Sequence, residues 1–202
     1  MRKIVVNTFL SLDGVYQGPG SPEEDTEGGF EVGGWQIPYF DEDAGKFIGE
    51  SYAATDGMLL GRVTYEAFAA FWPSAPDEDP FAAQMNSMPK YVVSRTLNEV
   101  KWNNSVLIKG NLAEEVAKLK QQPGPGRLAV VGSGKLVQSL TRHNLVDEYE
   151  LWVHPVVLGS GKALFGGGLP KTPLKLVNSK TTGSGIVILT YQPAPRELVP
   201  SA

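Results

Sequence analysis

A glycine turn between an apolar run and a helical pattern constrains this chain more than any other feature. Residues 128–131 form a continuous, partly β-branched apolar run, which is typical of a buried strand, and the run ends at Gly132-Ser133-Gly134. Leu136 and Leu140 then lie on one face of the helix that follows. Such a turn directs backbone N–H groups and the positive end of a helix dipole at one point, which favours an anion such as a pyrophosphate.

The turn matches neither of the two strict phosphate-binding motifs. A dinucleotide fingerprint needs a third glycine where Val137 stands. A P-loop needs glycine where Ala129 stands and Ser or Thr where Leu136 stands. An ordinary strand–helix turn therefore remains an alternative to a phosphate site.

Length and composition indicate one soluble domain. We expect it to span residues 1–192 of the 202, followed by a flexible, proline-rich tail at residues 193–202. The net charge of −4 argues against nucleic acid or an anionic membrane as the main partner. The chain contains no cysteine, which excludes disulfides, thiol catalysis and cysteine–zinc sites. We expect no metal site and a cytoplasmic location.

The N-terminus superficially resembles a signal peptide, because Arg2-Lys3 precedes an apolar run at residues 4–12. Polar residues such as Asn7 interrupt that run, and Asp13-Gly14 stands where a small-residue cleavage site would be needed. We interpret residues 4–12 as a central strand covered on both faces. The glycine-rich, acidic loop that follows at residues 14–34 has a length typical of an active-site lid or of a mobile surface loop.

Strand and helix patterns alternate along the first three quarters of the chain. Further strands are expected at residues 57–60, 90–96, 106–108 and 128–131, and helices begin near residues 42, 62, 81, 112 and 134. From residue 146 the pattern changes to strands alone, at residues 146–158, 174–181 and 186–192. This order predicts an α/β fold with a mainly parallel central sheet, flanking helices and a C-terminal antiparallel portion.

Three of the expected strand ends carry residues that suit a phosphate. They are Gly61-Arg62-Val63-Thr64, Ser94-Arg95-Thr96 and Gly132-Ser133-Gly134-Lys135. The carboxyl ends of parallel strands share one edge of the sheet, where ligands bind. Arg62 would stand in the first turn of a helix, where a cation opposes the dipole, so it should have an anion or an acidic partner.

Together with two further motifs, these segments resemble the dihydrofolate reductase-like superfamily. The further motifs are Ser11-Leu12-Asp13-Gly14 and Val146-Asp147-Glu148-Tyr149, the second leading to His154-Pro155-Val156-Val157-Leu158-Gly159. The most similar branch is the reductase domain of riboflavin biosynthesis, the RibD C-terminal domain. The resemblance spans about residues 3–192, and its motifs occur in the right order.

The resemblance implies NADPH as cofactor. Arg62, Ser94 and Arg95 would surround the adenosine 2′-phosphate, and Thr64 with the glycine turn would hold the pyrophosphate. Asp13 would lie near the nicotinamide as a catalytic candidate that relays a proton through water. Surface ion pairs and a simple turn hydroxyl are the alternatives for the arginines and for Ser94. The implied cofactor-binding residues are Gly61, Arg62, Thr64, Ser94, Arg95, Gly132, Ser133, Gly134, Lys135 and Leu136.

The substrate is less constrained than the cofactor. Trp35-Gln36-Ile37-Pro38 is similar to the segment that opens the substrate helix of dihydrofolate reductases, where an acid two residues after proline binds the pterin. Phe40 occupies that position and Asp41 comes one residue late, which favours a helix N-cap role for Asp41 and disfavours folate. Trp35 and Asp41 are nevertheless the candidate substrate residues. Trp35 would either stack on a flat substrate or pack in the core. We interpret both histidines, His143 and His154, as structural.

The resemblance therefore implies a homodimeric NADPH-dependent reductase. Its hydride acceptor would be small and heterocyclic, of the phosphoribosylamino-pyrimidine type reduced by 5-amino-6-(5-phosphoribosylamino)uracil reductases, or an unrelated carbonyl or imine. The homodimer would form through the antiparallel part of the sheet. The alternative is a non-catalytic nucleotide- or ligand-binding homodimer that retains the fold. A reductase that prefers a flavin to NADPH is a third possibility.

Overall fold

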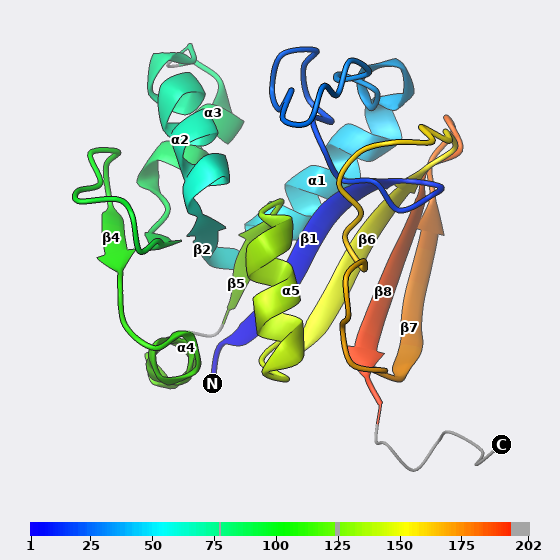
Figure 1. Cartoon of the computed structure of the whole chain (residues 1–202). Coiled ribbons are helices and arrows are strands. Elements are labelled where there is room, and N and C mark those ends of the chain that lie inside the picture. The colour runs from blue at the N-terminus through cyan, green and yellow to red at the C-terminus, as the bar shows by residue number, and fades with distance from the viewer. Residues whose placement is uncertain (77, 124–125, 195–202) are drawn as a thin grey trace, which may run out of the picture.

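An eight-stranded sheet forms the centre of the protein in the computed structural model, which describes residues 1–76, 78–123 and 126–194 (Figure 1). The strand order across the sheet is β4-β3-β2-β5-β1-β6-β8-β7. The strands are β1 (Lys3–Ser11), β2 (Thr55–Gly61), β3 (Lys90–Val93), β4 (Ser105–Ile108), β5 (Arg127–Val131), β6 (Glu148–His154), β7 (Leu174–Thr181) and β8 (Val187–Pro193).

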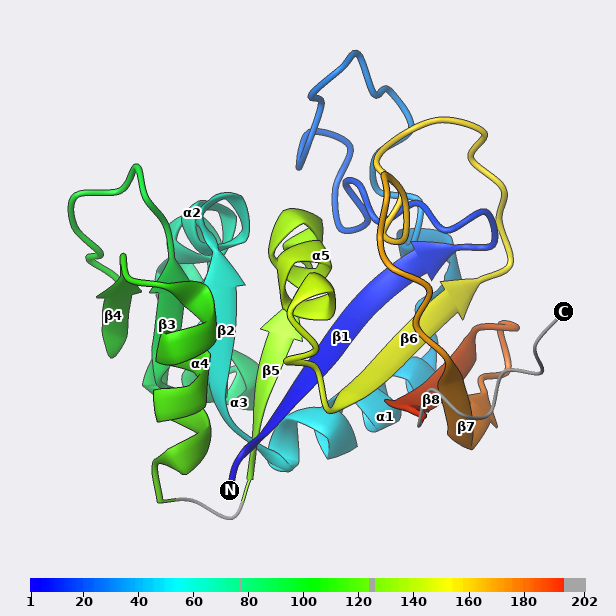
Figure 2. The same ribbon diagram turned by 60° about the horizontal axis from the view of Figure 1, so that its bottom comes forward.

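Helices cover both faces of this sheet. Figure 2 shows α4 and α5 in front of the strands and α1 and α3 behind them. None of the helices in the described part of the chain is long and apolar enough to cross a membrane. The helices are α1 (Glu42–Ala53), α2 (Arg62–Phe71), α3 (Pro80–Ser87), α4 (Leu112–Gln121) and α5 (Gly134–Arg142), with 3₁₀ turns η1 (Ile37–Tyr39) and η2 (Trp72–Ser74).

The predicted fold class is confirmed. Strands β1 to β6 pair in parallel, and β8 pairs antiparallel with both β6 and β7. Two predicted strands are shorter than expected. The strand predicted at residues 90–96 ends at Val93, because the Ser94 hydroxyl accepts the backbone N–H groups of Thr96 and Leu97 and closes a turn. The strand predicted at residues 146–158 ends at His154, just before a proline that cannot donate to the ladder.

The predicted tail begins later than expected. Pro193 is the last residue of β8, and the Ala194 N–H donates to the carbonyl of Pro173 across the same pair of strands. Residues 195–202 lie outside the described part of the chain, so the flexible tail stays a prediction for them.

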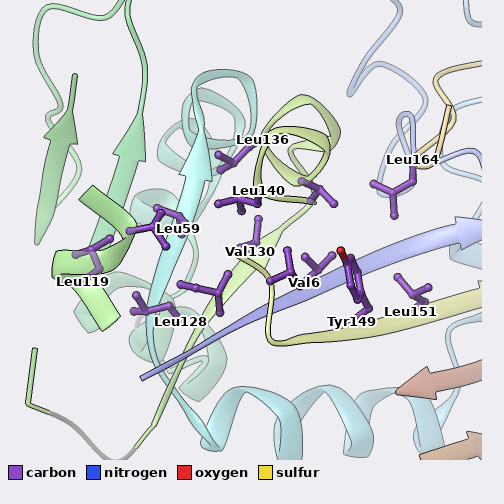
Figure 3. Close-up of a cluster of buried hydrophobic side chains, with 14 of the residues drawn as sticks. Val6, Leu59, Leu119, Leu128, Val130, Leu136, Leu140, Tyr149, Leu151 and Leu164 are labelled. Atoms are coloured by element: carbon purple, nitrogen blue, oxygen red, sulfur yellow. The ribbon is translucent and has the colours of Figure 1, made fainter. Parts of the chain in front are cut away.

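The main core lies between the sheet and α4 and α5. Figure 3 shows Val6, Val130, Leu136 and Leu140 converging there, and all four are buried. A second core under α1, α2 and α3 includes Met58 and other side chains that point to the opposite face. Because both faces are covered, the central strands are apolar on both of their alternating sides, as the sequence of β1 predicts.

The sheet has a topological switch point between its neighbouring strands β5 and β1, because the chain continues from these two strands toward opposite sides of the sheet. From β1 it runs through α1 to β2 on one side, and from β5 it runs through α5 to β6 on the other. The pairing of β1 with β5 stops at Asn7 and Val131, whereas its pairing with β6 continues to Ser11 and His154. Beyond Asn7, the edge of β1 that faces β5 is therefore open. Ligands of open α/β sheets bind at such a switch point.

Candidate functional site

A cleft of about 1380 Å³ opens at this switch point. One wall comes from α2, η2 and α3, and the other comes from α1 and the loop at residues 14–34, which face each other in Figure 1. Pockets for one drug-sized ligand usually hold roughly 300–1000 Å³. The cleft is therefore large enough for two small ligands side by side.

The glycine turn joins the N-termini of two helices at the cleft. Gly132 and Ser133 both adopt left-handed backbone conformations, each with a φ of 54°. The Ser133 hydroxyl donates to Thr64 Oγ1 at 2.7 Å and accepts the Gly61 N–H at 2.9 Å. These bonds hold the first turn of α5 against the first turn of α2. Two positive helix ends with unpaired N–H groups thus meet at one place, which suits an anionic group.

Four cationic side chains lie around these helix ends. Arg62 pairs with Glu66 at 2.7 Å, which confirms the acidic partner expected for it. Arg95, Lys109 and Lys135 are exposed and form no ion pair within the described residues. We call Arg62, Arg95, Lys109, Lys135 and the glycine turn the cationic half of the cleft.

All ten residues predicted to bind the cofactor line the cleft, and their contact with NADPH stays a prediction. One of these residues, Ser94, has a structural role. Ser94 is buried and its hydroxyl accepts two backbone N–H groups, so it has the turn role considered as the alternative. Arg95 lies on the turn that Ser94 closes. Among the described residues, no cluster of three or more His, Asp or Glu side chains that could hold a metal ion is found.

Asp13 lies outside the cleft lining. Its carboxylate accepts the Ser11 hydroxyl at 2.6 Å and the backbone N–H groups of Leu158 and Gly159 at 3.1 and 2.8 Å. These hydrogen bonds, that from Ser11 first, lower the pKa of Asp13 to about 2. The carboxylate is thus an anion that ties the end of β1 to the loop after β6. A proton-relay role for Asp13 stays a prediction, and this position does not support it.

The two candidate substrate residues also lie outside the cleft lining. Trp35 is buried, its indole N–H donates to the carbonyl of Gln17 at 2.7 Å, and its ring packs edge-on against His154. Asp41 is the N-cap of α1, as the sequence indicates, and it accepts the N–H groups of Ala44 and Ser184. Both positions agree with the structural roles considered as alternatives, and substrate contact stays a prediction for each.

The loop at residues 14–34 forms part of one wall of the cleft, and Lys162 holds it in place through ion pairs. The Lys162 ammonium contacts the carboxylates of Asp25 and Glu27, each at 2.6 Å. Burial alone would lower the pKa of Lys162, but its hydrogen bonds to the two acids raise the pKa instead. Gln17 adds hydrogen bonds to the same segment. These contacts hold residues 25–27 of the loop to Gln17 and to the segment that follows β6.

Sequence reasoning missed several residues that line the cleft. Lys109 and Gly110 follow β4 directly, so the strand-end argument used for the other motifs would have found them. The Tyr16 ring lies so close to Gly134 that a Cβ there would stand 2.2 Å from its Cζ. This tyrosine has no local motif, because only the path of the loop in the folded chain brings it to α5.

The comparison with protein families identifies the fold family. The model of the RibD C-terminal domain matches residues 2–188. The chain belongs to the RibD C-terminal domain family. The resemblance inferred from the sequence motifs is therefore confirmed.

Two curated proteins of Bacillus subtilis (strain 168) are similar to this RibD C-terminal domain over most of their length. The uncharacterized protein YyaP is 34% identical over 197 residues, with 94% of each chain covered. The uncharacterized protein YwjB is 28% identical over 185 residues, with 92% of this chain and 95% of YwjB covered.

Solved structures share the fold at lower identity. A protein from Shewanella sp. PV-4 that is provisionally assigned to riboflavin biosynthesis has a TM-score of 0.73 at 23% identity, covering 96% of this chain and 100% of its own. RibD of Acinetobacter baumannii has a TM-score of 0.65 at 13% identity over 96% of this chain, which spans 58% of that protein. A pyrimidine reductase-like protein of Corynebacterium diphtheriae has a TM-score of 0.63 at 11% identity, covering 96% of this chain and 92% of its own.

Proposed function

We propose that this protein is an NADPH-dependent reductase that transfers hydride to a small, flat substrate. Membership of the RibD C-terminal domain family supports a reductase-like role. The observation that carries the proposal is the pair of helix N-termini, joined by Ser133 and surrounded by cations, at one end of a cleft that has room for a second ligand. That arrangement suits a phosphate-rich cofactor beside a separate substrate.

The residues of the cationic half fit NADPH by their chemistry. Guanidinium groups match phosphate oxygens with planar donors, and the exposed Arg95 has no competing acid among the described residues. We assign the 2′-phosphate to Arg62 and Arg95, with Lys109 beside them, and the pyrophosphate to the glycine turn. NADPH would supply the hydride, while the chain would bind, orient and shield the reacting groups.

Specific residues, or the ligand that binds, distinguish other functions from this proposal. Dihydrofolate reduction is disfavoured, because Phe40 stands at the pterin-binding position and Asp41 is committed to the N-cap of α1. A phosphoribosylamino-pyrimidine of the riboflavin pathway is one candidate substrate within the proposed class. A non-catalytic nucleotide-binding protein would bind NADPH without turnover, and a flavin-dependent reductase would bind a flavin in its place.

Thermal unfolding with and without nucleotide tests the proposal. A ligand at about 100 times its Kd stabilises the folded state by about 2.7 kcal/mol. We expect NADPH to raise the melting temperature more than NADH does, and Arg62→Ala to abolish the difference. Arg142→Ala is the control, because Arg142 is exposed at the end of α5 and outside the cleft lining. Equal shifts with the two nucleotides would contradict the NADPH assignment.

Turnover is a separate measurement. NADPH oxidation at 340 nm would be followed with a panel of carbonyl and imine compounds that includes 5-amino-6-(5-phosphoribosylamino)uracil. Nucleotide binding with no oxidation across the panel would favour the non-catalytic alternative.

We also propose that two copies form a homodimer through the antiparallel part of the sheet. Strand β7 is the last strand of the sheet, and Leu176 and Val177 on it are 47% and 44% exposed. Apolar side chains on an edge strand favour association with another chain. Light scattering should give the mass of a dimer for the native chain and of a monomer for Leu176→Lys/Val177→Lys. A dimer that survives in this variant would exclude this surface.

A further inference from the structure

A group of aromatic side chains forms another part of the cleft lining. Tyr52 of α1 packs against Phe81 of α3 with ring centroids 5.0 Å apart. Trp72 contacts Phe81 at 5.4 Å and Phe71 at 4.9 Å, and Phe68 lies 6.3 Å from Trp72. We call Tyr52, Phe68, Phe71, Trp72 and Phe81 the aromatic half of the cleft.

Part of this wall is exposed to the cleft rather than packed away. Phe71 is 62% exposed, and Phe40, which also lines the cleft, is 56% exposed. Single exposed apolar residues are ordinary, but two large aromatic ones that line one concave surface favour a ligand site. An apolar or aromatic ligand would remove this surface from water.

Two glycines of α1, the helix that also supplies Tyr52, border the aromatic half. Gly45 and Gly49 line the cleft one helical turn apart, and a Cβ at Gly49 would meet nothing within 4 Å. Glycine inside a helix costs roughly 0.5–1 kcal/mol relative to alanine. Because no neighbouring atom would obstruct a Cβ at Gly49, close packing does not explain the glycine at this position. The effect of these glycines is to leave a slot between the backbone of α1 and the aromatic rings. Such a slot admits a flat molecule.

Among the described residues, those of the bordering helices that line this slot beyond Thr64 carry no charge. Beyond Thr64, every cleft-lining residue of α1, α2, η2 and α3 is apolar, aromatic or glycine. Lys162, which follows β6 and also lines the cleft, is bound to Asp25 and Glu27. A phosphate placed among these rings would lose its hydration without gaining a cation, which is costly. The slot therefore selects against phosphorylated molecules.

One polar group stands on the floor of the cleft. Thr8 is only 3% exposed, its residue lines the cleft, and its hydroxyl has no hydrogen-bond partner within the described part of the chain. Buried hydroxyls are normally paired, so an unpaired one in a ligand cleft calls for a partner supplied by the ligand. Thr8 follows the last residue of β1 that pairs with β5, at the open edge between the two halves.

We infer that the aromatic half binds the substrate, and that this substrate is a neutral, flat aromatic or heteroaromatic carbonyl or imine compound without a phosphate group. The inference rests on the proposed function, because the cationic half must be taken by NADPH for the slot to hold a second molecule. Reduction would move one hydride from NADPH, leaving NADP⁺, to the carbonyl or imine carbon. A proton from water would complete an alcohol or an amine.

A matched pair of probes tests this inference through binding alone. 1-Naphthol and 1-naphthyl phosphate share one flat ring system and differ by the phosphate. With the protein saturated by NADP⁺, equilibrium dialysis should give at least tenfold tighter binding for naphthol. Equal affinities, or a preference for naphthyl phosphate, would overturn the inference.

Two variants locate the binding. Gly49→Leu should fill the slot and weaken naphthol binding at least tenfold, since a Cβ at this position meets open space. Phe71→Arg introduces a cation and should shift the preference toward naphthyl phosphate. Phe165→Arg is the control, because Phe165 is 48% exposed but lies outside the cleft lining. An unchanged naphthol preference in Phe71→Arg, or the same shift in Phe165→Arg, would refute the assignment.

Failure of this inference can be distinguished from failure of the proposed function. Both cleft variants should keep the thermal stabilisation by NADPH, because neither residue belongs to the cationic half. If NADPH stabilises the native chain but naphthol does not bind, the substrate class is wrong and the cofactor assignment stands. If naphthol binds in the slot but NADPH gives no stabilisation, the aromatic site stands without the proposed reductase.

Discussion

The two halves of the cleft are built in different ways. The cationic half comes from short segments at the ends of β2, β3, β4 and β5, and two helix N-termini joined by Ser133 fix its shape. The aromatic half comes from side chains near the C-terminal ends of α1 and α2, from η2, and from the first turn of α3. Backbone geometry therefore constrains the first half, whereas the second can change with single side chains. One fold can keep its cofactor site in this way while it takes different substrates.

Among the variants that compare the two halves, Arg95→Ala should cause the largest change, which is a loss of NADPH affinity. A hydrogen bond to a charged group contributes about 1.5–3 kcal/mol, so NADPH binding should weaken by about 10- to 100-fold. NADH binding and naphthol binding should stay unchanged, because Arg95 would meet only the 2′-phosphate. Isothermal titration with the two nucleotides measures the difference. An equal loss for NADH would move Arg95 away from the 2′-phosphate.

Gly134→Ala should act on both the fold and the cationic half. The added Cβ would lie 2.2 Å from the Tyr16 ring, so the ring or α5 must move. Overpacking of this kind typically costs about 1–3 kcal/mol. Chemical denaturation should show that loss, together with weaker NADPH binding. The double variant Gly134→Ala/Tyr16→Ala should recover the stability, since it removes the clash. A loss that persists in the double variant would mean that the glycine is needed by the backbone itself.

The sequence predicts the cationic half well because each of its parts is local. In each part a charged or hydroxyl residue directly follows a strand end or its glycine turn, and parallel pairing brings such ends together. All ten predicted cofactor residues line one cleft for this reason. Lys109 follows the same rule, because it comes directly after the last residue of β4.

The aromatic half could not be predicted in this way. Phe68 and Trp72 lie at spacings that indicate the buried face of a helix, and both do pack against the second core. Nothing in that periodicity shows that the same rings also border a cleft, because this depends on how far α1 stands from α2 and α3. Asp13 is a residue whose structural role the sequence did not indicate. Its motif suggests chemistry, while its carboxylate binds loop amides.

Ser133→Ala tests whether the joined helix ends make the cationic half more rigid than the aromatic half. The variant loses the hydrogen bonds to Gly61 and Thr64, each of which contributes about 1 kcal/mol or less. We expect a modest loss of stability by denaturation and weaker NADPH binding, with naphthol binding unchanged. Ser139→Ala is the control, since its hydroxyl bonds only within α5. Equal effects of the two variants would remove the special role of Ser133.

Thr8→Val should have the smallest effect, and it tests the boundary between the halves. Valine has the shape of threonine without the hydroxyl, so an unpaired buried group disappears and stability should stay level or rise by a few tenths of a kcal/mol. If the substrate bonds to this hydroxyl, KM should rise several-fold while NADPH affinity stays constant.

A buried threonine whose hydroxyl is paired provides the matched control for Thr8. Thr182 is 5% exposed and its hydroxyl accepts the Ile186 N–H at 3.1 Å, so Thr182→Val should lose about 1 kcal/mol and leave KM unchanged. Opposite signs of the stability change in the two variants would show that the Thr8 hydroxyl is kept at a cost to the fold. If Thr8→Val leaves KM unchanged, the Thr8 hydroxyl does not bind the substrate. The boundary between the two halves would then lie elsewhere on the floor of the cleft.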